Sequence, residues 1–234
     1  MSTSANKPAA KPARTSSART DSAELLRVRA TKNARYVPFL KNKAGVQFYG
    51  RILELGAGPA WFSAELSKLP KVVEIVATDF GSRPSSDESV QVFKLLRAHE
   101  AKITRRSVSP HCLDFPANHF DFVVCAGVLH DAMNLLHLLR EIRRVLKPGG
   151  QLVAVREPVR PFMRSRGRGA AHARVLKAPL YSRADYADTF DRAGFTLQTK
   201  RVSLATGLKF YFDTVINGFT HARFAFIAAK REKN

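Results

Sequence analysis

Residues 51–61 read RILELGAGPAW, and this stretch decides the fold. The apolar run 51–55 predicts a short strand, two glycines follow at positions 56 and 58, and the apolar spacing over 61–69 predicts a helix. A strand that enters a helix through a glycine turn points backbone N–H groups and the positive helix end at a polar or anionic ligand. A dinucleotide-binding turn would need glycine at position 61, which is Trp61, so that ligand class is disfavoured.

Downstream of this turn, predicted strands alternate with predicted helices. The alternation predicts an α/β fold: a doubly wound, mostly parallel seven-stranded sheet with helices on both faces. No long helical pattern separates the last two strands, so the closing strand is expected to run antiparallel. The further strands are expected at 72–78, 103–108, 122–126, 151–155, 197–204 and 222–229, and the further helices at 85–101, 131–146 and 182–193.

Upstream of the turn, residues 1–22 are predicted to form a disordered basic tail, and residues 23–234 a single domain. The first 20 residues contain no acidic residue and, after Met1, no large apolar one, so they cannot bury enough surface to order themselves. An organellar targeting segment is the alternative for this Ser- and Arg-rich start. Two cysteines without a CxxC spacing fit a reducing compartment, and a cytoplasmic location is expected.

The charge is the unusual feature of the composition. Thirty-nine Lys and Arg against 19 Asp and Glu give a net charge of +20, which predicts an acidic partner or substrate. Seven basic residues and one acidic residue lie between 156 and 177, in a Pro- and Gly-containing segment that is predicted to be a loop. This loop is either a solvated connection or part of the binding cleft. With 45% hydrophobic residues but no unbroken apolar stretch of about 18–20 residues, a fibrous chain and a membrane span are excluded.

Several blocks together resemble the class I S-adenosylmethionine-dependent methyltransferases. The stretch 54–60, ELGAGPA, is similar to their motif I, with Ala60 at the third glycine. Asp79 ends the second predicted strand, where an acid can bind ribose hydroxyls. The blocks 120–124, FDFVV, and 144–150, RVLKPGG, resemble the small-molecule-directed, methyltransferase type 11-like branch, and 181–195 is similar to the helix that follows there.

This resemblance implies S-adenosyl-L-methionine as the cofactor and assigns the residues that bind it. Glu54 and the turn Gly56, Ala57 and Gly58 would hold the methionine part, Asp79 the ribose, and Phe80 would lie against the adenine. In place of the family's frequent acid at the end of the third strand, this chain has Ser109, so Ser109, Ser107, Cys112 or the backbone would contact the adenine amino group. No metal site is expected, because His111, His137 and His221 lack a ligand spacing.

Two residues at predicted strand ends are candidates for a general base. His130 follows the fourth strand and has the better chemistry at neutral pH, although it could instead pack under the ligand or cap a helix. Glu157 follows the fifth strand and could instead pair with Arg156 or Arg160. Two aromatic groups are expected in the core, or, for some members, along the substrate: Tyr36, Phe39, Phe48 and Tyr49, and Phe210, Tyr211, Phe212 and Phe219.

The sequence therefore predicts a methyltransferase that acts on a small or lipid-like acceptor, which the basic charge suggests is anionic. An RNA-directed methyltransferase is the first alternative, because two basic segments are expected to flank one cleft, 1–22 with its continuation to residue 50 and 156–177. A non-catalytic basic nucleic-acid-binding protein on the same fold is the second. The intact Glu54, Gly56, Gly58 and Asp79 disfavour that second alternative.

Overall fold

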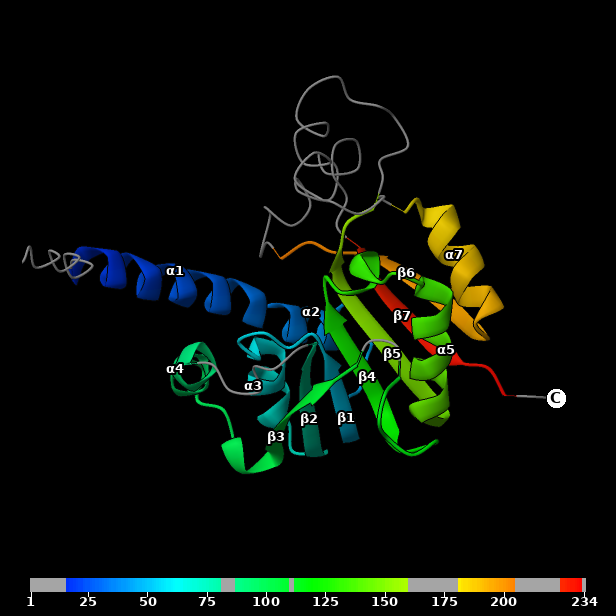
Figure 1. Cartoon of the computed structure of the whole chain (residues 1–234), viewed down its shortest axis with the longest axis horizontal. Coiled ribbons are helices and arrows are strands. Elements are labelled where there is room, and N and C mark those ends of the chain that lie inside the picture. Colours follow the sequence, from blue (N-terminus) through cyan, green and yellow to red (C-terminus); the bar gives the residue numbers. More distant parts are fainter. Residues whose placement is uncertain (1–15, 81–86, 110–111, 160–180, 205–223, 233–234) are drawn as a thin grey trace, which may run out of the picture.

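The computed structural model describes residues 16–80, 87–109, 112–159, 181–204 and 224–232. They contain one seven-stranded sheet with the strand order β3-β2-β1-β4-β5-β7-β6 (Figure 1). Neighbouring strands are parallel from β3 to β5, and β7 is antiparallel to both β5 and β6, which confirms the predicted doubly wound fold and its antiparallel closing strand. The strands are β1 Gly50–Leu55, β2 Val72–Phe80, β3 Ile103–Val108, β4 Phe120–Ala126, β5 Leu146–Glu157, β6 Phe195–Arg201 and β7 Phe224–Lys230.

Helices cover both faces of the sheet, because consecutive parallel strands need helical crossovers. Alternate residues of each strand face opposite layers: Ile52 packs with the core on the side of α1 to α4, and Leu53 with the core on the side of α5 and α7. Figure 1 shows α3 and α4 on one side of the sheet and α5 and α7 on the other. The helices are α1 Ser16–Ala34, α2 Tyr36–Asn42, α3 Trp61–Ser67, α4 Asp87–Leu96, α5 Leu135–Val145 and α7 Arg183–Arg192, with short 3-10 helices η1 Glu100–Lys102 and η2 Leu129–Asp131.

Two helix boundaries differ from the prediction for identifiable local reasons. The helix expected over 85–101 ends at Leu96, because Arg97 adopts a left-handed conformation with φ 53° that stops helical propagation. The helix expected from 131 begins at Leu135, where the Asn134 side chain caps it by accepting a hydrogen bond from the His137 N–H.

The N-terminal helix α1 begins at Ser16, inside the stretch 1–22 that was predicted to be a tail. Its Ala, Leu and Arg residues have high helix propensity, and it packs on α3 and α4, which the tail composition alone did not reveal. Tyr36, Phe39 and Phe48 are buried as expected, whereas Tyr49 is half-exposed.

Several predicted features lie outside the described residues. They are the first 15 residues of the predicted tail, the basic positions Arg160, Arg164, Arg166, Arg168, Arg174 and Lys177, the aromatic positions Phe210, Tyr211, Phe212 and Phe219, and His111 and His221. Within the described ranges, no helix is long and apolar enough to cross a membrane.

The blocks 120–124 and 144–150 stabilise the end of the sheet at which the parallel strands begin. Asp121 accepts hydrogen bonds from Lys147 Nζ at 2.8 and 2.9 Å and from the Arg51 N–H at 2.8 Å. Arg144 donates to the carbonyl oxygens of Leu113 and Phe115, both at 2.7 Å. These blocks therefore stabilise the fold, and they lie at the opposite end of the strands from the glycine turn.

Candidate functional site

The glycine turn after β1 contains three left-handed residues at alternate positions. Gly56 and Gly58 have φ values of 63° and 51°, and Ala60, at the first helical boundary of α3, has φ 56°. A side chain on Gly56 would collide with Val128, whose Cγ2 lies 2.5 Å from the position of a Cβ. No atom lies within 4 Å of the corresponding position at Gly58, so this glycine faces open space. The Ala57 N–H donates to the Thr78 carbonyl at 2.9 Å and ties the turn to β2.

Glu54 lies directly below this turn and is buried. Its Oε2 accepts a hydrogen bond from the Ser63 N–H at 2.9 Å and a second from the Ser63 hydroxyl, so the first turn of α3 holds the carboxylate. Burial raises the pKa of Glu54 to about 7, because desolvation of the ionised form outweighs the hydrogen bonds from Ser63.

Asp79 and Phe80, at the end of β2, face the same turn. Asp79 Oδ1 accepts from the Gly58 N–H at 2.9 Å, and its Oδ2 lies 3.3 Å from Arg105 Nη2 on β3. Phe80 is 39% exposed, and its ring reaches the neighbourhood of Gly56, 3.8 Å from the position of a Cβ there. An aromatic ring that stays partly exposed beside a glycine turn offers a flat surface to a ligand.

Ser109 lies at the far side of this group. Val108 is the register partner of Phe80 in the β2–β3 pair, so Ser109 follows the strand end next to Phe80. It forms an isolated antiparallel bridge with Cys112, and both residues are exposed. Its contact with adenine stays a prediction.

His130 and Glu157 come together at the ends of β4 and β5. Glu157 is buried, and its carboxylate accepts hydrogen bonds from the backbone N–H groups of Val128, Leu129 and His130 at 2.9, 3.1 and 3.2 Å. The same carboxylate lies 3.0 Å from His130 Nδ1, while His130 Nε2 lies 3.3 Å from the exposed Asp131. The hydrogen bond to Glu157 raises the pKa of His130 above its ordinary value.

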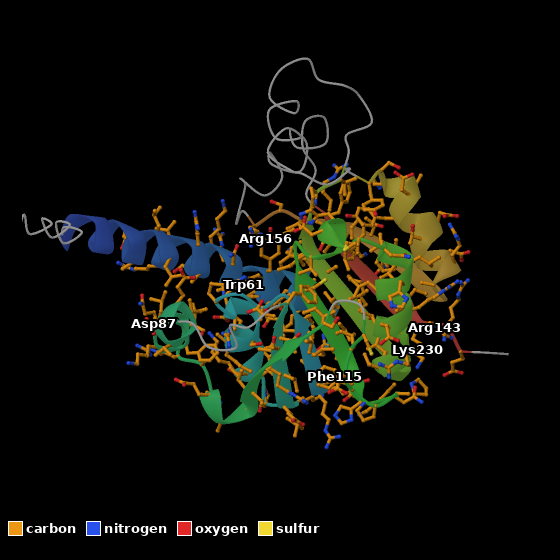
Figure 2. All side chains as sticks on the ribbon, in the orientation of Figure 1. Trp61, Asp87, Phe115, Arg143, Arg156 and Lys230 are labelled. Carbon is orange, nitrogen blue, oxygen red and sulfur yellow. The ribbon has the colours of Figure 1, made fainter. Side chains whose placement is uncertain are left out.

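A strained residue precedes Glu157 in β5. Arg156 has φ 61°, and the pairing of β5 with β7 shifts register between Val155 and Glu157. Arg156 is exposed and Glu157 is buried, as the alternation of side chains along a strand allows. Figure 2 shows Arg156 near the upper end of the sheet, well away from Phe115 and Lys230. The alternative role of Glu157, an ion pair with Arg156, is not what the structure has, because the buried carboxylate of Glu157 contacts His130 and three backbone N–H groups instead.

The structure brings the predicted residues to one end of the sheet, where the parallel strands finish. Gly127 joins the two halves of the site: its Cβ position would lie 3.8 Å from His130 Cε1 and 3.6 Å from the Arg156 carbonyl. Sequence reasoning missed Ser63, which donates hydrogen bonds to Glu54, and Arg105, which contacts Asp79. Ser63 lies nine residues after Glu54, within the first turns of the predicted helix, but serine there carries no distinctive signal.

The arrangement fits S-adenosylmethionine. The open space at Gly58 admits a ligand against the backbone, and Asp79 keeps unused lone pairs on both oxygens for hydroxyl groups. Glu54 provides a carboxyl group whose ionised form a cationic ligand would favour. No three His, Cys, Asp or Glu side chains in the described part of the chain group as metal ligands.

Comparison with known proteins agrees with this geometry. Residues 53–154 match a family model described as a methyltransferase domain. A stretch of 113 residues, 45% of this chain, is 33% identical to the highly reducing polyketide synthase aurA of Calcarisporium arbuscula. The chain spans only 4% of that synthase, and 3% to 5% of other curated relatives that it matches.

Solved structures share the fold, among them two methyltransferases. An S-adenosylmethionine-dependent methyltransferase from Mesorhizobium loti superposes with a TM-score of 0.62 at 17% identity, over 84% of this chain and 98% of that one. Phosphoethanolamine N-methyltransferase 2 of Haemonchus contortus, in complex with phosphomonomethylethanolamine and S-adenosylhomocysteine, superposes with a TM-score of 0.63 at 14% identity, over 86% of this chain and 53% of that one. At these identities the likeness establishes the fold.

Proposed function

Because this chain carries a class I S-adenosylmethionine-dependent methyltransferase domain of the type 11 branch, we propose that it methylates a small or lipid-like, anionic acceptor. The observation that carries this proposal is the meeting of the cofactor residues Gly58 and Asp79 with the His130–Glu157 pair at one edge of the sheet. S-adenosylmethionine, when bound, supplies an already activated methyl group. The chain's own residues then have to bind the cofactor and the acceptor, orient the acceptor and remove its proton.

The proposed binding roles follow from the contacts. Glu54 and the turn Gly56–Gly58 receive the methionine part, Asp79 receives the ribose hydroxyls, and Phe80 lies against the adenine with Ser109 at its edge. Glu54 and Asp79 place two carboxylates around a cationic ligand, which favours it electrostatically.

We assign the proton transfer to His130. A carboxylate only accepts hydrogen bonds, so Glu157 fixes the proton on Nδ1 of His130 and leaves Nε2 to take a proton from the acceptor. Because Asp131 is mostly exposed, it can yield its place at Nε2 to an acceptor. Glu157 is a positioning residue here, since its carboxylate is used by three backbone amides and the imidazole.

The acceptor class rests on the surroundings of the pair. Met133, between η2 and α5 at the same edge, is 89% exposed, and Phe80 is 39% exposed, so the edge offers apolar surface. Arg156, in the same strand as Glu157, adds an exposed positive charge at this end of the sheet. Apolar surface next to one cation suits a lipid-like or aromatic molecule that carries an anionic group.

An RNA acceptor is the second candidate. The observation that favours it is helix α1, which exposes Arg27, Arg29 and Lys32 and is followed by the exposed Arg35. Nucleic-acid binding through such residues weakens steeply with salt, by nearly one unit of log–log slope for each phosphate contact.

Calorimetry and methyl-transfer assays test the proposal. The chain should bind S-adenosylmethionine and S-adenosylhomocysteine more tightly than NAD, and tighter binding of NAD would overturn the cofactor assignment. Methyl transfer from labelled cofactor should then label a small-molecule fraction of an extract, and nuclease treatment should leave this label unchanged. Label that disappears with nuclease, together with a steep salt dependence, would favour RNA instead.

A further inference from the structure

Arg105 lies inside β3 and contacts the glycine turn and Asp79. From the sequence, only residues at the end of this strand were expected near the cofactor. A single nitrogen, Nη2, lies 3.0 Å from the Gly58 carbonyl oxygen and 3.3 Å from Asp79 Oδ2. Arg105 is the register partner of Ala77, two residues before Asp79, so the two side chains rise from the same face of neighbouring strands. The Arg105 side chain is only 12% exposed.

These contacts complete a closed arrangement around Gly58. Its N–H donates to one oxygen of Asp79, and its carbonyl accepts from Arg105, which also contacts the other oxygen of Asp79. Both peptide groups of the glycine that faces open space are thus fixed by side chains from β2 and β3. A left-handed glycine without such contacts could rotate easily, because no side chain limits it.

We infer that Arg105 is a positioning residue for the cofactor: it holds the Gly58 peptide and the Asp79 carboxylate in the shape that receives S-adenosylmethionine. The inference rests on the cofactor half of the proposed function and is independent of the acceptor. Arg105 acts on the turn and on the ribose-binding acid, not on the sulfur. Removing the Arg105 side chain should therefore weaken the binding of S-adenosylmethionine and of S-adenosylhomocysteine by the same factor.

The neighbouring Arg106 provides a matched control. It lies on the same strand, is exposed, and places its guanidinium 5.2 Å from the centre of the Phe115 ring, away from Asp79. Arg105→Gln and Arg106→Gln remove the same charge from the same strand. Arg105→Lys keeps a positive charge and a hydrogen-bond donor at this position, and a single nitrogen makes both contacts in the parent.

The experiment is calorimetric titration of the parent and the three variants with both ligands, together with their thermal unfolding. We expect Arg105→Gln to bind both ligands about 10- to 30-fold more weakly, as the loss of hydrogen bonds to a charged group predicts, while Arg106→Gln and Arg105→Lys stay within about threefold of the parent.

Three results would overturn the inference. The first is equal affinities of Arg105→Gln and Arg106→Gln. The second is an Arg105→Gln chain that does not fold, together with an Arg105→Lys chain that folds but binds as weakly as a chain without the cation. The third is a loss confined to one of the two ligands. A parent chain that binds neither ligand would instead refute the proposed function itself, so the two failures are distinguishable.

Discussion

The carboxylate of Glu157 lies 3.0 Å from Nδ1 of His130 and also accepts the backbone N–H of that same residue at 3.2 Å. One acid therefore fixes both the main chain and the ring of the proposed base. The residue before this acid, Arg156, is strained, with φ 61°, and lies where the pairing of β5 with β7 shifts register.

The first prediction concerns this pair. In Glu157→Gln the neutral amide no longer stabilises the imidazolium, so the pKa of His130 should fall toward its ordinary value. His130 accepts a proton only when neutral, so methyl transfer rises with pH through this pKa, and the variant's midpoint should move to lower pH. We expect its plateau rate to drop by about 10- to 100-fold, because the ring is no longer fixed.

The measurement is the pH profile of kcat, with an NMR titration of His130. Glu141→Gln is the matched control, because Glu141 also accepts a backbone N–H, from Leu113, and pairs with Arg144, but it lies on α5 away from the site. A midpoint that does not move in Glu157→Gln would remove Glu157 from its positioning role.

The fold could be predicted from the sequence because its signals are local. The strand β1, the glycine turn and the apolar stripe of α5 each follow from residue spacing, and the strand β3 was predicted at its observed bounds. Helix ends were less certain, because a left-handed Arg97 leaves no trace in composition.

The site was predicted only in part, because its supporting contacts join distant segments. Glu54, Gly58, Asp79 and His130 stand at strand ends, which topology brings together. The contact of Arg105 with Gly58 spans 47 positions, and an arginine in an edge strand is most simply interpreted as solvated. The contacts of Glu157 with the N–H groups of Val128, Leu129 and His130 likewise join positions 27 to 29 residues apart.

A second prediction follows from the buried Glu54. Its pKa is 4.5 in an unfolded chain and about 7 in the fold, so the folded state holds the proton more tightly. The free energy of unfolding should therefore fall as pH rises from 4.5 to about 7, by about 3 kcal/mol from this group. Urea unfolding of the parent and Glu54→Gln at pH 5 and pH 8 measures it.

The variant should gain stability relative to the parent as pH rises, because glutamine can still accept from Ser63 but has no charge to bury. Glu74→Gln, which changes an exposed acid paired with Arg51, should show no such trend. A difference between Glu54→Gln and the parent that stays constant across pH would contradict the raised pKa.

A third prediction tests the end of α4. Arg97 is exposed and has φ 53°, a conformation that costs an L-residue about 1–2 kcal/mol and glycine almost nothing. Glycine also gives the unfolded chain more conformational entropy, which offsets part of this gain. Arg97→Gly should therefore raise the free energy of unfolding by about 0.5–1 kcal/mol. Lys94→Gly, an exposed change inside the same helix, should lower it by about 1 kcal/mol. Thermal unfolding that ranks the two variants in the opposite order would show that Arg97 is not left-handed in solution.

The last prediction separates backbone strain from cofactor contact at Gly58. Gly58 and Gly149 have φ values of 51° and 71°, and no atom lies within 4 Å of a Cβ at either position, so alanine should cost each about 1–2 kcal/mol of folding free energy. Gly149 lies near the start of β5, at the opposite end of the parallel strands from Gly58. Gly58→Ala should weaken the binding of S-adenosylmethionine at least tenfold, because the alanine methyl group enters the space where the backbone meets the ligand. Gly149→Ala should bind the cofactor like the parent. Calorimetry, with urea unfolding to match the two variants in stability, gives the comparison. Parent-like binding by Gly58→Ala would mean that the open space beside this glycine is not where the cofactor lies, and equal losses in both variants would assign the effect to strain alone.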